Sequence, residues 1–310
     1  MDKHIKDVPT KHINPFRESA VDTGPKPADT ARHAATRHFV QQLARDLEAE
    51  DFDLPPFPDT AMRIQECIRD PNSDNQSLSA IVATEPPLAA RLMRMANSVM
   101  MRRGPVEVTD IPTAISRVGM EMVQNAATSF AAREAFKPRP GSPCIEELKK
   151  LRRHSISMAA IAYLLARHVK GIRKPDEAML AGLLSSVGKF YIFTQAGDQP
   201  ELFNDREELD LLVAEWHTGV ARAIVESWHF PDTIAVAVDE QELRQRDRNA
   251  SADLSDLLYI ANIIARTGIG SAQHLGDSDA LARMRLDATR LHTLLTESEE
   301  EIQSMVSALS

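Results

Sequence analysis

The sequence predicts an all-α protein. Apolar residues recur at three- and four-residue spacing through most of the chain, and stretches that alternate apolar with polar residues are nearly absent. The composition is 43% hydrophobic, which is enough for a buried core and argues against disorder of the whole chain. A length of 310 residues corresponds to one large domain or two ordinary ones.

The N-terminal part divides into two segments. Residues 1–30 contain four prolines and few apolar residues at helical spacing, so we expect a disordered tail. Helical periodicity begins near residue 31, where Phe39, Val40 and Leu43 lie on one helical face. This pattern predicts an N-terminal helix within residues 31–53.

Residues 54–136 are expected to form a helical bundle whose helix ends are marked by proline and glycine. The first expected helix contains Met62, Ile64 and Ile68 and stops at Asp70, and a short helix capped by Ser77 follows. The next is opened by Pro86 and Pro87 and ends near Asn97. Two more helices are expected from Pro112 to Val118 and from Met120 to Phe136. A proline-rich linker, residues 137–143, follows, and its composition suggests a hinge between two helical halves.

The second half, residues 144–268, opens with a long amphipathic segment over 145–169. Further helices are expected near 176–187, 207–214, 217–228, 231–239 and 252–266. Residues 269–310 should add two or three shorter C-terminal helices. Ser298 and Glu301 have the spacing of a capping box for the last of them.

Charge and composition limit the cellular role. Lys and Arg number 36 against 45 Asp and Glu, a formal net charge of −9, which disfavours nucleic-acid binding. The longest apolar run is nine residues, 158–166, whereas a membrane span needs about 20. The two cysteines, Cys67 and Cys144, are far apart and form no metal-ligand pair. We therefore expect a cytoplasmic protein without membrane insertion.

Known catalytic motifs are absent from the sequence, and no cofactor is expected. The nearest match is a degenerate phosphate-binding loop from Gly182 to Lys189. Five residues instead of four separate its glycines, Phe190 follows the lysine, and no strand precedes it. This segment is therefore not expected to bind phosphate.

Two groups of side chains near residue 97 have open interpretations. Arg91, Arg94, Arg102 and Arg103 form either an exposed helix face or a surface that binds an anion or a partner. The second group is Met93, Met95, Met100 and Met101, which either fill the core or contribute to a partner-binding surface. The basic run at 149–153 is expected to be a solvated face.

A series of short motifs over residues 47–265 resembles the HDOD domain family. The positions that carry the resemblance are Pro55, Pro58, Asn97, Ser98, Gly119, His154, Gly182, Gly188, Lys189, His217, Gly219, Trp228 and Pro231. Each motif is weak alone, but their order and spacing together are specific.

The resemblance implies an all-α domain related in fold to the HD phosphohydrolases, with a smaller helical bundle beside a larger HD-like part. Such domains are generally non-catalytic modules of bacterial signalling, often acting with cyclic-di-GMP enzymes or response regulators. A protein partner is therefore expected. Neither its identity nor the oligomeric state follows from the sequence.

The metal-binding positions of HD hydrolases are degenerate here. The resemblance places His154 at the first position, Ser185 and Ser186 at the His-Asp pair, and Asn262 at the last aspartate. Two hydroxyls cannot replace an imidazole and a carboxylate as ligands, so catalysis of the HD type is not expected. These four groups either satisfy one another or bind a nucleotide without metal. A residual metal-dependent phosphohydrolase remains the enzymatic alternative.

Overall fold

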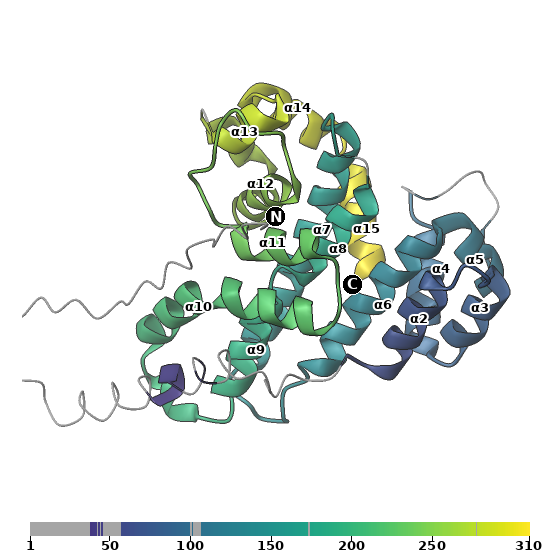
Figure 1. Cartoon of the computed structure of the whole chain (residues 1–310), viewed down its shortest axis with the longest axis horizontal. Helices are drawn as coiled ribbons and strands as arrows, with labels where there is room; N and C mark the ends of the chain where they lie inside the picture. Colours follow the sequence, from purple (N-terminus) through teal and green to yellow (C-terminus); the bar gives the residue numbers. More distant parts are fainter. Residues whose placement is uncertain are drawn as a thin grey trace, which may run out of the picture.

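The computed structural model describes residues 38–41, 43, 45, 57–99, 101, 107–172, 174–276 and 278–310 (Figure 1). Every regular element in these residues is a helix, which confirms the all-α prediction. The expected tail 1–30 and Pro55 lie outside them. Of the expected helix at 31–53, the described residues are helical, and Phe39 and Leu43 are buried. No helix in the described part is long and apolar enough to cross a bilayer.

The first group of helices agrees closely with the sequence prediction. It consists of α2 (Asp59–Arg69), α3 (Asn75–Ala83), α4 (Pro86–Ala96), α5 (Ile111–Val118) and α6 (Met120–Ala135). One cap was wrong: Asp74, not Ser77, caps α3, and its carboxylate accepts a 2.8 Å hydrogen bond from the Ser77 amide. An aspartate directly before the first turn supplies the acceptor that the free amides require.

The second group contains α7 (Ile145–His168), α8 (Pro175–Leu184), α9 (Val187–Ala196), α10 (Arg206–Ser227), α11 (Asp232–Glu240) and α12 (Leu254–Thr267), with 3-10 helices η1 (Pro200–Asn204) and η2 (Ile269–His274). Two predictions were wrong here. The expected helices 207–214 and 217–228 are one continuous helix, α10. The sequence also did not predict α9, which is buried around most of its circumference and therefore lacks an amphipathic period.

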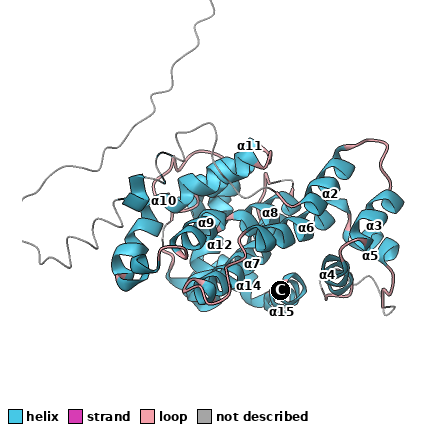
Figure 2. Ribbon diagram, turned by 90° about the horizontal axis from the view of Figure 1, so that it is seen from below, coloured by secondary structure: helices cyan, strands magenta, loops and turns pink. Residues whose placement is uncertain are grey.

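The C-terminal segment forms α13 (Asp279–Met284), α14 (Ala288–Glu297) and α15 (Glu299–Leu309). The capping box expected at Ser298 is wrong, because the Ser298 side chain makes no capping hydrogen bond. Its backbone instead connects α14 directly to α15. Helix α15 packs against both α4 and α7, so the end of the chain joins the two groups of helices (Figure 2).

A single buried apolar cluster extends through both groups of helices. At the junction, the Trp228 ring lies 5.0 Å from that of Phe57 and 6.1 Å from that of Phe136. Helix α6 also packs against α8. Movement at the hinge expected in 137–143 would expose this apolar surface to water, so the structure argues against that hinge.

Two glycines permit unusually close helix packing. A Cβ on Gly182 would lie 2.5 Å from the Ala159 Cα, where α8 crosses α7. A Cβ on Gly188 would lie 2.0 Å from the His217 carbonyl oxygen, where α9 crosses α10. Both obstacles are backbone atoms and cannot rotate away. The two crossings fix the positions of His217 and of the segment between α8 and α9.

We expect Gly188→Ala to destabilise the fold by about 1–3 kcal/mol or more, because the added methyl group must push α9 away from α10. Chemical denaturation measures this. The matched control is Gly219→Ala on the exposed side of α10, where a Cβ would meet nothing within 4 Å. The control should be neutral or stabilising by up to about 1 kcal/mol through helix propensity. Equal effects of the two substitutions would contradict the close packing.

Trp228 is 5% exposed and fills the junction between the two groups of helices. Trp228→Ala is therefore expected to cost about 3–5 kcal/mol, seen as a lower thermal midpoint. Leu211→Ala, at a residue that is 67% exposed, serves as the control and should change stability by no more than about 0.5 kcal/mol. An unchanged midpoint for the tryptophan variant would show that the ring is not a core group.

Candidate functional site

The four degenerate HD positions lie on two helices and on the junction between two others. His154 lies on α7, Ser185 and Ser186 form the junction between α8 and α9, and Asn262 lies on α12. His154 Nε2 is 3.0 Å from Asn262 Oδ1. Burial, and then the charge of Lys189, lower the pKa of His154 below its usual value. The imidazole is therefore neutral at pH 7, with Nε2 donating to the amide oxygen.

The Ser185 hydroxyl is used within the fold. It donates to the Gly182 carbonyl at 2.7 Å and lies 3.2 Å from the Met158 sulfur. The Ser185 carbonyl accepts a 2.8 Å hydrogen bond from the Gln241 side chain. Both Ser185 and Ser186 are 2% exposed. This segment thus ends α8 and starts α9, and the Ser185 hydroxyl is already hydrogen-bonded within the fold.

A charged group lies next to these positions. Lys189 Nζ is 3.3 Å from Glu242 Oε1, and His217 Nε2 is 3.2 Å from the same oxygen. The 3.2 Å separation places the His217 ring against the Glu242 carboxylate, although neither ring nitrogen meets strict hydrogen-bond geometry. His217 is fully buried, and burial lowers its pKa.

Glu242 is the member of this charged group that the sequence did not reveal. His217, and then the Lys189 ammonium, lower its pKa to about 2, against the opposing effect of partial burial. Glu242 follows α11 directly, beside Gln241. The acidic residues just before it pair elsewhere: Asp239 with Arg222 and Glu240 with Arg246.

The donor set does not fit a catalytic metal. Serine hydroxyls and a carboxamide are neutral, and they neither balance a divalent charge nor bind it well. The Lys189 ammonium contributes a positive charge close to His154 and would repel a cation. Within the described residues, no three His, Cys, Asp or Glu side chains are grouped so that they could hold a metal ion. We therefore derive no hydrolytic step at this position.

The predicted arginine group is not one surface. Arg91 is 3% exposed, and its guanidinium donates to the Ser129 hydroxyl at 3.1 Å and to the Ser310 main-chain oxygen at 3.2 Å. Burial, and then Arg133, lower its pKa to about 10. Arg94 is exposed. Arg102, Arg103 and Met100 lie outside the described residues.

The methionines near this group have apolar neighbours. Met95 is fully buried, and Met93 and Met101 are partly buried against the core. These positions favour the core interpretation.

The remaining family positions organise turns and helix ends. Asn97 makes two hydrogen bonds with the main chain of Val108, donating at 2.9 Å and accepting at 2.8 Å. Gly119, at φ 91°, turns the chain between α5 and α6. Pro58 and Pro231 precede the first turns of α2 and α11, and Ser98 is buried. These residues of the motifs therefore lie at turns, at helix ends or in the interior of the fold.

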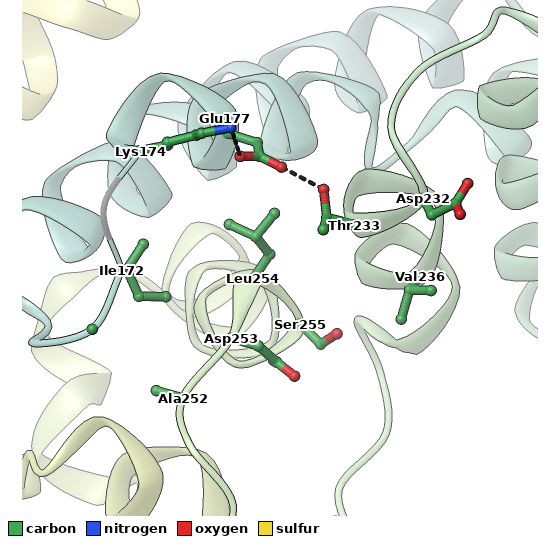
Figure 3. Close-up of a pocket in the computed structure, with 11 residues that line it drawn as sticks. Ile172, Lys174, Glu177, Asp232, Thr233, Val236, Ala252, Asp253, Leu254 and Ser255 are labelled. Carbon is green, nitrogen blue, oxygen red and sulfur yellow. Dashed lines mark hydrogen bonds and ion pairs between the residues drawn. The ribbon is translucent and has the colours of Figure 1, made fainter.

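Two adjoining hollows lie away from the degenerate HD positions. The first, about 540 Å³, lies among the N-terminal ends of α8, α11 and α12 (Figure 3). The second, about 380 Å³, continues between α6, α8 and α11. Lys174 and Glu177 line both of them. None of the four degenerate HD positions lines either hollow.

The model of the HDOD domain matches residues 54–243, so this chain belongs to the HDOD family. This confirms the family that its motifs indicated. The match ends before α12, although α12 supplies Asn262 to the degenerate site.

Solved structures share the fold. One is a protein of Shewanella amazonensis SB2B with the provisional name metal-dependent phosphohydrolase, at 23% identity and a TM-score of 0.72, covering 89% of this chain and 100% of the other. Another is a Marinobacter aquaeolei VT8 protein with the provisional name signal transduction protein, at 21% identity and a TM-score of 0.57, covering 90% and 66%.

A curated relative, an uncharacterized protein of Treponema pallidum (strain Nichols), is 22% identical over 205 residues. The match covers 62% of this chain but only 38% of that relative's length.

The low pKa of Glu242 predicts a pH-dependent contribution to stability. Its folded value, about 2, lies below the ordinary 4.5, so the carboxylate stabilises the fold above about pH 4.5, and this is lost as the pH falls toward 2. Glu242→Gln should lower the thermal midpoint at pH 7, and the difference from wild type should shrink on acidification. Exposed Glu107→Gln is the control and should show no such trend. A pH-independent difference would contradict the assignment.

Proposed function

We propose that this chain is a regulatory protein of bacterial signal transduction, which binds a protein partner in the cytoplasm and does not turn over a substrate. The observation that carries the proposal is the chemistry of the degenerate HD positions. The metal ligands are replaced by neutral groups, and the remaining His154 is hydrogen-bonded to Asn262. Family membership supports the same view, since HDOD domains are generally non-catalytic signalling modules.

The partner that we propose is another signalling protein, such as a response regulator or a cyclic-di-GMP enzyme. The shared fold with a Marinobacter aquaeolei protein named for signal transduction is consistent with this class. A domain organisation of a bundle at 54–136, an HD-like part at 144–268 and C-terminal helices at 269–310 is part of the proposal. The net charge of −9 favours a protein rather than a nucleic acid.

Two alternatives make different predictions. A residual phosphohydrolase must bind Mn²⁺ or Fe²⁺ at a stoichiometric level and hydrolyse a phosphodiester. A nucleotide sensor must bind cyclic-di-GMP without cleaving it. The geometry supports neither alternative, because His154, Ser185 and Asn262 already use their polar groups within the fold.

We expect no hydrolysis of cyclic-di-GMP or of bis(p-nitrophenyl) phosphate above the protein-free rate, with Mn²⁺ or Fe²⁺ supplied and metal content measured by elemental analysis. Calorimetric titration with cyclic-di-GMP should give no saturable heat. Stoichiometric metal together with turnover that is lost in His154→Ala would overturn the proposal and restore the enzymatic alternative.

His154→Ala leaves the buried face of Asn262 without its partner, which is expected to cost about 1–3 kcal/mol of stability. Partner capture, measured by affinity purification with cross-linking and mass spectrometry from the source cells, should stay at the wild-type level. Gly219→Ala is the control for an ordinary substitution on a neighbouring helix. If His154→Ala abolishes capture while the fold is intact, the degenerate site has a binding role.

A further inference from the structure

The two adjoining hollows form one groove, which we call the α8 groove. Its lining combines apolar and charged side chains, and Lys174 and Glu177 belong to both parts. Its first part lies among the N-terminal ends of three helices, and its second part reaches across α8 to α6.

The first part of the groove has an apolar floor. Ile172, Val236 and Leu254 come from the loop before α8, from α11 and from α12, and all three are only partly buried (Figure 3). Apolar side chains in a concave site are the usual means by which a protein binds the apolar residues of a ligand or partner.

Part of the charge around the groove is already balanced. Glu177 lies 3.6 Å from Lys174 and also accepts a hydrogen bond from Thr233 (Figure 3). Asp253, which lines the first part, is paired with Arg246. These contacts stabilise the walls of the groove and need no external cation.

Three carboxylates of the groove have no ion-pair partner within the described residues: Glu121, Asp176 and Asp232. Asp176 is partly buried, and burial, followed by the charge of Glu121, raises the pKa of its carboxyl group. Asp176 and Glu121 thus repel each other at the same edge of the second part. A cation at this edge would relieve the repulsion, whereas a phosphate would increase it.

We propose that the α8 groove docks a cationic amphipathic segment of a partner protein. Apolar side chains of that segment lie over Ile172, Val236 and Leu254, and a Lys or Arg lies against Asp176 and Glu121. The inference rests on the proposed function and adds to it the surface and the chemistry of the partner. Phosphates of a cyclic dinucleotide would be repelled at the acidic edge of the second part.

The test uses the full chain and defined peptides. The probe is a fluorescein-labelled 18-residue amphipathic helix of Leu and Lys, with matched Leu/Glu and Ser/Lys peptides, and binding is followed by fluorescence anisotropy. We expect saturable 1:1 binding of the Leu/Lys peptide, with affinity that falls as salt is added. The Leu/Glu peptide should not bind, and the Ser/Lys peptide should bind at least about tenfold more weakly.

The variants locate the binding. Glu121→Gln with Asp176→Asn should weaken binding of the Leu/Lys peptide by about tenfold, which corresponds to about 1.4 kcal/mol. Ile172→Ala should also weaken it. The control, Glu201→Gln with Glu215→Gln, makes the same change of net charge at exposed positions on η1 and α10. It should leave the affinity within about twofold.

Several results would overturn the proposal: no saturable binding, equal binding of the Ser/Lys peptide, or equal losses in the groove and control variants. Partner capture separates this inference from the proposed function. If the wild-type protein and the groove variants capture a specific partner equally well, the docking proposal is wrong and the proposed function stands. If the wild-type chain captures no specific partner, the proposed function is wrong.

Discussion

The close crossings of α8 over α7 and of α9 over α10 determine the arrangement of this protein. Gly182 and Gly188 allow backbone to approach backbone at distances that no side chain would permit. Between these two crossings lies the Ser185–Ser186 junction, so its place relative to His154 and His217 is fixed by packing rather than by polar contacts.

The polar side chains around the degenerate HD positions contact one another. Lys189 brings a positive charge to the region that a metal ion would need, and Glu242 compensates it from the end of α11. His154 and Asn262 satisfy each other across two helices. The chain therefore supplies the partners of these polar and charged groups itself. The site thus supports the fold, and the binding role that we propose moves to the α8 groove.

The α8 groove and the degenerate site share helices but differ in character. At the degenerate positions, His154, Asn262 and Ser185 form hydrogen bonds within the fold. The groove instead combines partly exposed apolar side chains with carboxylates that have no ion-pair partner among the described residues. A partner that binds across α8, α11 and α12 would contact the same helices that hold Ser185 and Asn262. The packing that fixes these helices would in this way also position the proposed interaction surface.

The sequence by itself determined the helical class, most helix boundaries in residues 59–136, and the family, because prolines, glycines and apolar periodicity act locally along the chain. It did not reveal α9, whose burial removes the amphipathic period, nor the continuity of α10 through Glu215 and Trp216. It also could not show that Arg91 is buried, that Asp74 replaces Ser77 as a cap, or that Glu242 meets Lys189 and His217. The contacts of Arg91 and Glu242 join residues far apart in the chain, and the cap of α3 depends on which of two nearby polar side chains reaches the free amides. Only the tertiary structure decides which of these contacts form.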